Sequence, residues 1–511
     1  MIKKSFEDLC ILDLANNHFG SVKHAKNIIS SFAKIIKKRK INTAIKFQFR
    51  DLDNFIHKNY IHSEEKYIKR FLETKLSDES FKKIFSFIKS KKIKTACTPF
   101  DENSITKIEK LNFDYLKIAS VSALDFSLHE RAIKNKIPKI ISTGGLELKD
   151  IDKIVSFYSK KNQKFAIMHC VAIYPSKNSD LNISVIKNLK KRYPGVPIGW
   201  STHEDPNEFN PSVLAYACGA RLFEKHIGID SVKFKLNSYS ITPNLFDNWY
   251  TNLQSAKEIY GNPQKQITFA EKETLEKLQR GIFAKTDLKK NTILNNKNTY
   301  FAFPLNKGQL PAPELKEGTI LTKNTKKDDI IEIKFIKKDQ KKIIDNLIFS
   351  YLHELKAMLN YRSIQIGETF DLEISHHKGI KSFRKTGAFL FNIINKEYAK
   401  KLIVMLPNQN HPLHHHKEKS ESFRIISGKL YITNNKIKHI LRSGQVFHVN
   451  KKSWHKFRSG NEGCIFEEIS TRAINSDSYY KNKKIKNISR TNRKTYINNW
   501  FSIKNIVNQK Q

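Results

Sequence analysis

Eight short apolar runs, spread over the first 260 residues, constrain the fold of this chain more than any other feature. Each run has the length of a buried strand, and longer stretches with helical spacing of apolar residues lie between them. The runs occupy residues 9–15, 43–48, 95–100, 115–120, 139–143, 165–170, 197–202 and 221–227. Eight strand–helix units in about 260 residues is the size of a TIM barrel. We therefore predict a closed (β/α)8 barrel over residues 1–265.

An open, doubly wound α/β sheet has a similar composition and is the main alternative. Such a sheet gathers its polar ligand-binding residues at one switch point, where the strand order reverses. In this chain polar residues follow nearly every run instead, among them Lys46, Ser120, Ser142 and His203. That distribution favours the closed barrel, in which all eight strands end at one mouth.

Beyond the predicted barrel the strand–helix alternation stops. Residues 266–335 hold short segments separated by turn signals and predict a small β-rich module. One amphipathic helix is predicted at 336–360, as a linker. Period-two alternation then predicts a second β domain over 361–475, and a basic, Asn-rich tail at 476–511 completes the chain.

The charge balance narrows the class of ligand. Lys and Arg number 92 against 49 Asp and Glu, which gives a formal net charge of +43. The lysines are spread along the whole chain and are not interleaved with stacking aromatics, so we do not expect nucleic acid to be the main ligand. The charge instead favours anionic substrates or an acidic partner.

Two further absences bear on location. No run of about 18 apolar residues is present, so we expect no membrane-spanning helix. The five cysteines are scattered singly, at Cys10, Cys97, Cys170, Cys218 and Cys464. Because a disulfide framework would need paired spacings, we expect reduced cysteines and a cytoplasmic protein.

Cationic, hydroxylated and imidazole side chains close several of the predicted strands. They are Lys46, Lys117, Ser120, Ser142, Ser201, His203 and His226. A buried lysine is costly unless it meets an anion, and hydroxyls with free backbone N–H groups hold phosphate oxygens. Two imidazoles on neighbouring strands suit an open Mn²⁺ or Zn²⁺ site. Singly, such a serine is usually a helix cap and such a histidine a structural residue, but together they predict a site for a phosphorylated anion beside a divalent metal.

The same segments resemble the sialic acid synthase family, whose members condense phosphoenolpyruvate with an aldose to make nonulosonic acids. The resemblance covers the first 260 residues and rests on ordered motifs, which are more specific than any single one. They are Asp13-Leu14-Ala15-Asn16-Asn17-His18-Phe19-Gly20, Ile45-Lys46-Phe47-Gln48, Thr98-Pro99-Phe100-Asp101, Leu116-Lys117-Ile118-Ala119-Ser120, Ile141-Ser142-Thr143-Gly144, Met168-His169-Cys170 leading to Tyr174-Pro175, Gly199-Trp200-Ser201-Thr202-His203, and Phe223-Glu224-Lys225-His226.

The resemblance implies roles for individual residues. Phosphoenolpyruvate would be held by Lys46, Thr98, Lys117, Ser120, Ser142 and Ser201. The catalytic set would be Asp13, Lys46 and Lys117, with Asn17, Gln48 and Tyr174 also on the substrate side. His203 and His226 would bind Mn²⁺ or another divalent metal, which would polarise the aldehyde of the sugar.

Residues 278–325 resemble the antifreeze-like (SAF) module of that family, through Gln279-Arg280-Gly281-Ile282-Phe283-Ala284 and Asp287-Leu288-Lys289-Lys290. In the family this module caps the active site of a partner subunit. The resemblance therefore implies a domain-swapped homodimer.

Several positions depart from the family pattern. Asp13 stands for a Glu, Ser122 for the Glu of a Ser-Gly-Glu segment, Leu236-Asn237 for an Asp-His pair, and Phe303-Pro304 lacks a preceding Arg. The groups for phosphoenolpyruvate and metal are thus kept, while sugar-side and proton-transfer groups are altered. This indicates either a different acceptor sugar or a non-catalytic sugar- or phosphate-binding relative. A further carboxylate at the site, such as Asp101 or Glu204, would favour catalysis.

A second candidate site lies in the C-terminal β domain. His414-x-His416-x4-Glu421-x6-Gly428 and Gly444-x10-His455 have the spacing of the two cupin motifs. Two imidazoles and a carboxylate on one strand pair, with a third imidazole on a later strand, give a site with three nitrogen ligands and one oxygen ligand. The alternative is a solvated histidine run, which does not explain why Glu421, Gly428 and His455 also fall in place. We predict a cupin β-barrel that binds a divalent transition metal; its fold alone does not choose among an enzyme, a sensor and a stabilising module.

Together these patterns predict a cytoplasmic, metal-dependent transferase. Its fold class is α/β: a TIM barrel, a small SAF module and a cupin β-barrel. The predicted partners are phosphoenolpyruvate, an aldose and a second copy of the chain.

Overall fold

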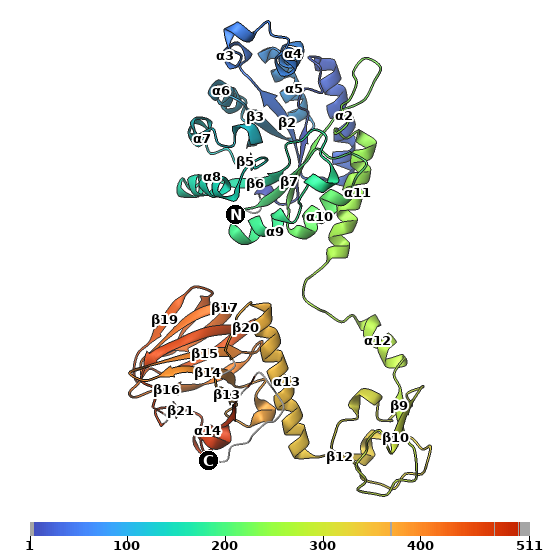
Figure 1. Cartoon of the computed structure of the whole chain (residues 1–511), viewed down its shortest axis with the longest axis vertical. Coiled ribbons are helices and arrows are strands. Elements are labelled where there is room, and N and C mark those ends of the chain that lie inside the picture. Colours follow the sequence, from blue (N-terminus) through green and yellow to red (C-terminus); the bar gives the residue numbers. More distant parts are fainter. Residues whose placement is uncertain (1–4, 368–369, 475, 499, 501–511) are drawn as a thin grey trace. The chain divides into compact units, whose positions relative to one another are not determined.

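The computed structural model describes residues 5–367, 370–474, 476–498 and 500 (Figure 1). The chain divides into two compact units, Met1–Lys265 and Gln266–Gln511, and each is described by itself. Within the described ranges no helix is long and apolar enough to cross a membrane.

The first unit is a closed barrel of eight parallel strands in the order β1 to β8 (Figure 1). The strands are β1 (Leu9–Asp13), β2 (Thr43–Phe49), β3 (Lys94–Pro99), β4 (Tyr115–Ile118), β5 (Lys139–Ser142), β6 (Phe165–Cys170), β7 (Ile198–Ser201) and β8 (Leu222–His226). The barrel closes because β1 pairs with both β2 and β8. The predicted TIM barrel is confirmed, and the open doubly wound sheet is excluded.

Helices follow the strands and cover the outside of the barrel. They are α2 (Val22–Arg39), α3 (Leu52–Phe55), α4 (Lys66–Glu73), α5 (Asp78–Ser90), α6 (Glu102–Leu111), α7 (Phe126–Ala132), α8 (Leu148–Lys160), α9 (Val185–Arg192), α10 (Asn210–Cys218) and α11 (Pro243–Tyr260). Side-chain caps start several of them, such as Ser21 at α2 and Asp101 at α6. An apolar cluster that includes Ile11, Ile140 and Met168 fills the interior of the barrel. Polar groups are therefore left to the carboxyl ends of the strands.

The second unit begins with α12 (Phe269–Lys277) and a small β module. In this module β9 (Gly281–Ala284) pairs with β10 (Thr299–Ala302), and β11 (Thr319–Leu321) pairs with β12 (Ile336–Lys338), both antiparallel. A separate apolar core, with Ile282, Leu310 and Ile331 at its centre, holds the module together.

An antiparallel sheet forms the rest of the second unit, with α13 (Gln340–Tyr361) before it. Its strands are β13 (Leu372–Ser375), β14 (Ala388–Asn395), β15 (Tyr398–Met405), β16 (Asn410–His415), β17 (Glu421–Asn434), β18 (Ile437–Arg442), β19 (Val446–Val449), β20 (His455–Thr471), β21 (Tyr479–Tyr480) and β22 (Lys494–Ile497), with α14 (Lys483–Lys486) between the last two. The order along the sheet is β18-β17-β20-β15-β14-β13-β22, and β16, β19 and β21 pair off this path.

Two predicted boundaries need correction. The helix predicted as a linker packs on the sheet: Leu352 and Leu355 of α13 are fully buried in the same cluster as Phe389. The described part of the predicted tail also belongs to the sheet, because β22 pairs with β13 and Trp500 packs against Phe391. Residues 499 and 501–511 of that predicted tail lie outside the described residues. In both cases apolar side chains at regular spacing supply the burial that a linker or a free tail would lack.

Candidate active site and metal centre

Charged side chains from neighbouring strands meet at the carboxyl end of the barrel. In the strand register Asp13 of β1 stands beside Lys46 of β2 and His226 of β8. Lys46 Nζ lies 2.8 Å from Asp13 Oδ2 and 3.2 Å from Glu224 Oε1. From β4, Lys117 Nζ reaches the same Glu224 oxygen at 2.5 Å. Two ammonium groups and two carboxylates therefore form one buried cluster.

Burial and charge together set the protonation of this cluster. Burial raises the pKa of the Asp13 carboxyl, but the ammonium of Lys46 outweighs it and the pKa lies below its usual value. The pKa of Glu224 is lowered in the same way, since both lysines oppose the effect of burial. At Lys46 two carboxylates outweigh burial and raise the pKa, whereas at Lys117 burial prevails and lowers it. Lys117, with one carboxylate, is thus the ammonium that gains most from a further anion.

Hydroxyl groups surround the two ammonium groups. Ser201 Oγ lies 3.4 Å from Lys117 Nζ, and Thr98 Oγ1 accepts a hydrogen bond from Lys46 Nζ at 3.4 Å. Ser142 Oγ is buried and has no hydrogen-bond partner among the described residues. Ser120 Oγ accepts a hydrogen bond from the backbone N–H of Gly144 at 3.0 Å. The structure therefore brings the predicted anion-binding residues to one mouth.

The two histidines of the barrel lie side by side, with ring centroids 5.2 Å apart. His203 Nδ1 donates to the carbonyl of Val171 at 3.1 Å, which leaves its Nε2 for another partner. Nδ1 of His226 is buried without a partner in the described chain. Burial lowers the pKa of His203 to about 3 and also lowers that of His226, so both rings are neutral. This pair fits the predicted divalent metal, with Asp13 Oδ2 3.6 Å from His226 Nε2 and the ring of Tyr174 4.1 Å from that of His203.

Asn17 is placed in the wall of the mouth. Its Nδ2 donates to the carbonyl of Ile227 at 2.8 Å and to Ser240 Oγ at 3.0 Å, and its Oδ1 accepts from Asn237 at 3.2 Å. Its amide is therefore occupied by protein partners and holds the loop that follows β8. Asn237, one of the departures from the family pattern, belongs to this network.

Two carboxylates, Asp101 and Glu204, could have replaced the glutamate for which Ser122 stands, but they do not reach the lysine cluster. Glu204 is buried against Lys225 and Thr202, on the opposite face of β8. Asp101 caps α6, where its oxygen accepts the backbone N–H of Ser104 at 2.7 Å. The carboxylate at the centre of the mouth is Glu224.

Sequence reasoning includes Glu224 in a motif but assigns it no role. The signal lies in the period of the strand, because side chains alternate between the two faces. Glu224 and His226 share the inward face of β8, whereas Phe223 and Lys225 share the outward face. An acid two residues before a predicted metal ligand, on a strand, therefore points into the same mouth.

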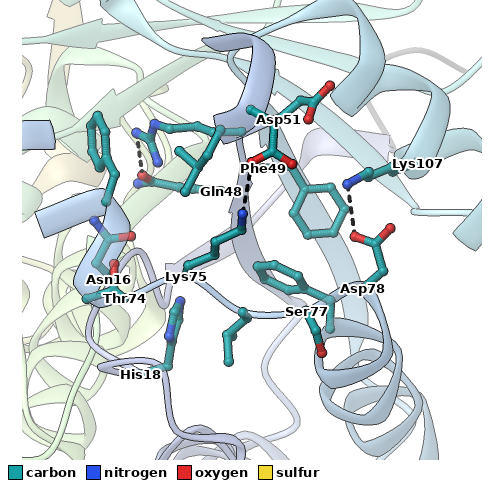
Figure 2. A pocket seen from close by; sticks show the side chains of 16 residues that line it. Asn16, His18, Gln48, Phe49, Asp51, Thr74, Lys75, Ser77, Asp78 and Lys107 are labelled. Carbon is teal, nitrogen blue, oxygen red and sulfur yellow. Dashed lines mark hydrogen bonds and ion pairs between the residues drawn. The ribbon is translucent and has the colours of Figure 1, made fainter. Parts of the chain in front are cut away.

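A cavity of about 250 Å³ opens beside the mouth, between the end of β2 and the start of α5 (Figure 2). Gln48 connects it to the cluster, since its Nε2 donates to Asp13 Oδ2 at 3.1 Å. Arg50 in turn donates to Gln48 Oε1 at 3.1 Å. Its guanidinium lies 4.1 Å from the ring centroid of Phe71 and 3.7 Å from that of Phe100. Sequence reasoning missed Arg50, because a residue after the strand end gives no sign of which side chains will surround it.

The other two cations of this cavity are paired. Lys75 lies 3.0 Å from Asp53, and Lys107 lies 2.9 Å from Asp78, a pair that Figure 2 shows at the rim. Arg50 has no carboxylate within 4.0 Å in the part of the chain that the structure describes. Burial lowers the pKa of Arg50 to about 10, which still leaves it charged at neutral pH. It is the cation of this cavity that is available to an anion.

A compact cluster of metal-binding side chains lies inside the C-terminal sheet. One ligand atom each of His414, His416, Glu421 and His455 falls within 4.8 Å of the others, and all four residues are buried. His414 of β16 is paired with His455 of β20 in the register. Glu421 begins β17, with Oε2 3.1 Å from His455 Nε2 and Oε1 3.3 Å from His416 Nε2. The spacing of the sequence motifs is thus realised as one three-nitrogen, one-oxygen centre.

The orientation of the three rings supports metal binding. Nδ1 of His414 hydrogen-bonds the carbonyl of Pro412 and Nδ1 of His455 that of Ser453, both at 3.0 Å, while Nδ1 of His416 meets the carbonyl of Asp477. Each carbonyl fixes the proton on Nδ1 and leaves Nε2 as a lone-pair donor. Burial holds the pKa of His414 well below its usual value. The four residues therefore fit a divalent transition metal.

The fold and these sites define a TIM-barrel protein with an anion-binding mouth, joined to a cupin. Comparison with known proteins gives the family. Residues 35–265 match the NeuB family and residues 401–466 match the cupin domain. The chain belongs to the NeuB family.

Three relatives illustrate the likeness. The chain is 27% identical to N-acetylneuraminate-9-phosphate synthase of Homo sapiens over 290 residues. This alignment covers 56% of this chain and 80% of that protein. It is 26% identical to N,N'-diacetyllegionaminic acid synthase of Campylobacter jejuni, over 63% of this chain and 98% of that protein. The crystal structure of a putative spore coat polysaccharide biosynthesis protein E from Chromobacterium violaceum is 36% identical, with a TM-score of 0.60, and covers 65% of this chain and 100% of that chain.

Proposed function

We propose that the barrel condenses phosphoenolpyruvate with an aldose to give a nonulosonic acid and phosphate. The observation that carries the proposal is the convergence of Lys46 and Lys117 on Glu224, beside the imidazoles of His203 and His226. Such a mouth combines cations for an enol phosphate with ligands for a metal next to them. Membership of the NeuB family, with synthases among the relatives, supports this chemistry.

The lysines and hydroxyls would bind the phosphoryl and carboxylate groups of phosphoenolpyruvate. Lys117 is the more available ammonium, and Ser142 offers an unpartnered hydroxyl. The same groups would stabilise the negative charge on phosphate as it leaves. Because the site is buried, each of these contacts is stronger than it would be in water.

Bond changes in the proposed reaction balance as follows. C3 of phosphoenolpyruvate forms a bond to the aldehyde carbon, and water adds at C2 and gives one proton to the aldehyde oxygen. The C2–O bond to phosphate then breaks, the hydroxyl at C2 becomes the keto group, and its proton leaves with phosphate. A metal on His203 and His226 would polarise the aldehyde. Asp13, which is ionised beside Lys46, would take the proton from the attacking water and pass it to the aldehyde oxygen.

The cavity of Figure 2 is the proposed acceptor side. Gln48 reaches from Asp13 into this cavity, and Arg50 lies behind it. An acceptor sugar held here would lie beside the proton-transfer carboxylate. The guanidinium of Arg50, which has no carboxylate partner among the described residues, favours an acceptor with an electronegative substituent at that end.

The small β module is proposed to be the SAF module, and the chain is proposed to form a domain-swapped homodimer. The end of α11 and the segment that follows it, up to residue 278, support an assembly, because large apolar side chains are exposed on them. They are Ile259, Ile267, Phe269, Leu275 and Leu278. A partner subunit would cover this surface. We further propose Mn²⁺ as the barrel metal, and a cytoplasmic location, which the five free cysteines support.

Turnover of defined substrates tests the proposal. The purified protein is incubated with phosphoenolpyruvate, Mn²⁺ and a panel of aldoses that includes N-acetylmannosamine and its 6-phosphate, and both phosphate and α-keto acid are measured. Equimolar appearance of the two products with one aldose is the expected result. Binding of phosphoenolpyruvate without turnover on any aldose would replace the enzyme by the non-catalytic binding protein.

A further inference from the structure

A second, larger cavity lies in the C-terminal sheet beside the metal-binding cluster. Its volume is about 610 Å³, which is typical of a site for a small molecule. His416 and Lys419 line this cavity and also line the small pocket at the cluster itself. A molecule in the cavity would therefore reach the edge of the metal centre.

Cations dominate the wall of this cavity. Its charged lining consists of Lys401, Lys419, Arg490, Arg493 and Lys494 against Glu373. Each of the three lysines already has a carboxylate partner. Lys494 Nζ lies 2.5 Å from Glu373, while Lys401 and Lys419 both contact Glu468, at 3.2 and 2.8 Å. The two arginines have no carboxylate within 4.0 Å in the described ranges of the chain.

Both guanidinium groups carry buried N–H groups that no described atom accepts. Nη1 of Arg490 and Nε of Arg493 are inaccessible to solvent and have no hydrogen-bond partner. Arg493 is held against the wall, 4.9 Å from the ring centroid of Tyr480. Because these two atoms have no accessible surface, an anion in the cavity would contact the other N–H groups of the two guanidinium groups, whose charge no described carboxylate neutralises.

The rest of the lining suits a hydroxylated molecule. The side chains of Asn392, Ser476 and Ser478 offer hydrogen bonds, and Tyr480 and Tyr496 offer ring surfaces. Planar guanidinium groups match carboxylate and phosphoryl oxygens in two-point contacts. The chemistry of the wall therefore combines an anion grip with an amide- and hydroxyl-lined chamber.

We propose that this cavity binds an anionic monosaccharide. Its carboxylate or phosphoryl group contacts Arg490 and Arg493, and its hydroxyl groups face the metal cluster. The site is separate from the mouth of the barrel and does not depend on the condensation proposed there. The cupin would then have its own class of ligand, which differs from the substrates proposed for the barrel.

Calorimetric titration of the metal-loaded, full-length protein tests this proposal. The probes are N-acetylneuraminate, whose anion is a carboxylate, glucose 6-phosphate, whose anion is a phosphoryl group, and the neutral sugar N-acetylmannosamine. Phosphoenolpyruvate is kept at saturation so that the barrel is occupied. We expect one of the two anionic sugars to bind at least about tenfold more tightly than the neutral one, the effect of one charge-assisted hydrogen bond.

Variants locate the binding. Arg490→Met with Arg493→Met should weaken it by at least about tenfold. Ser476→Glu, an exposed position that adds a negative charge at the cavity without disturbing packing, should weaken it in the same direction. Arg442→Met, an exposed arginine of β18 outside the cavity, is the matched control and should bind as the wild type does.

Three results would overturn the proposal. They are no binding of either anionic sugar, equal binding of the neutral sugar, and unchanged binding in the Ser476→Glu variant. Lys117→Met separates the two sites of the protein. Binding that disappears in Lys117→Met but survives in the double arginine variant would belong to the barrel and would also contradict the inference.

Discussion

The mouth of the barrel and the centre of the cupin both contain glutamate, lysine and histidine side chains, but in different arrangements. Each buries one glutamate among lysine and histidine side chains. In the barrel Glu224 accepts from two lysines, and the imidazole pair lies beside it. In the cupin Glu421 faces two imidazoles as well as Lys419. Two ammonium groups share the glutamate of the barrel, as suits the proposed anion site, whereas two imidazoles contact the glutamate of the cupin, as suits the proposed metal site.

The two folds reach these results by different routes. Parallel strands of the barrel each contribute one or two residues from distant parts of the sequence, such as Lys46, Lys117 and Glu224. Antiparallel strands of the cupin return within a few residues, so His414, His416 and Glu421 come from one short segment. The proposed metal centre can therefore be found as a local motif, while the proposed anion site forms only when the barrel closes.

Removing the central carboxylate of the barrel should have the largest effect. Glu224→Gln leaves two buried ammonium groups without their shared partner, and breaking a buried ion pair costs about 3–5 kcal/mol. Inorganic phosphate or phosphoenolpyruvate should restore part of the lost stability. Urea unfolding with and without these anions measures both effects.

The matched control for that variant is Glu204→Gln. It breaks the other buried pair of β8, with Lys225, which faces away from the mouth. Its loss of stability should not respond to phosphate. Equal rescue of the two variants would remove the distinction between an anion site and an ordinary buried pair.

Loss of one ammonium group should lower turnover next. Lys117→Met removes the lysine that has one carboxylate partner and is the more available to substrate. We expect kcat to fall by about 10²–10³, as for other charge-stabilising donors. Released phosphate is measured against Lys164→Met, an exposed lysine before β6. Turnover within twofold of the control would place the substrate elsewhere.

The cupin half of the comparison is tested through two adjacent histidines. His416→Ala removes a ligand, and since even the partners of ligands are worth about 10–100-fold in metal affinity, a loss of at least that size is expected. His415→Ala is the control, because this ring stacks on Tyr479 outside the cluster. Metal content after dialysis and calorimetry with Zn²⁺ give the two affinities. Similar losses in both variants would disprove the assignment of the cluster.

A third buried lysine of the barrel has no carboxylate within 4.0 Å among the residues that the structure describes. Lys139 is buried and donates to the carbonyl of Asn135 at 2.6 Å and to Gln163 at 2.9 Å, and burial lowers its pKa from 10.5 to about 8. Between these two pKa values the unfolded chain binds more protons, so this residue makes stability rise as pH rises. Relative to Lys139→Met, the wild type should gain about 1 kcal/mol between pH 7.5 and 9.5. Unfolding at both pH values checks this, and a constant difference would contradict it.

Much of the barrel could be predicted because its signals are local. Eight apolar runs of strand length, each ended by a polar residue, specify both the strands and the position of the mouth. The four residues of the cupin cluster could be predicted for the same reason. Glu224 was not assigned a role, because a motif shows which residues are present but not which face of the strand they occupy.

Other features depended on contacts between distant segments. Residues 479–497 look like a basic tail, yet β21 and β22 pair with the sheet and Arg490 and Arg493 line its cavity. Arg50 looks like any arginine after a strand, yet two phenylalanine rings enclose it. Charge and polarity alone give no sign of such burial.

Periodicity and spacing are enough to predict the eight-strand barrel, the lysines and histidines at its mouth, and the four residues of the cupin cluster. Contacts between distant segments are needed to show that Glu224 joins the two lysines, that Asp101 and Glu204 lie outside this cluster, and that two arginines of the last segment line a cavity. This is because the sequence specifies the charge of a side chain, whereas the packing of distant segments decides which partner it meets.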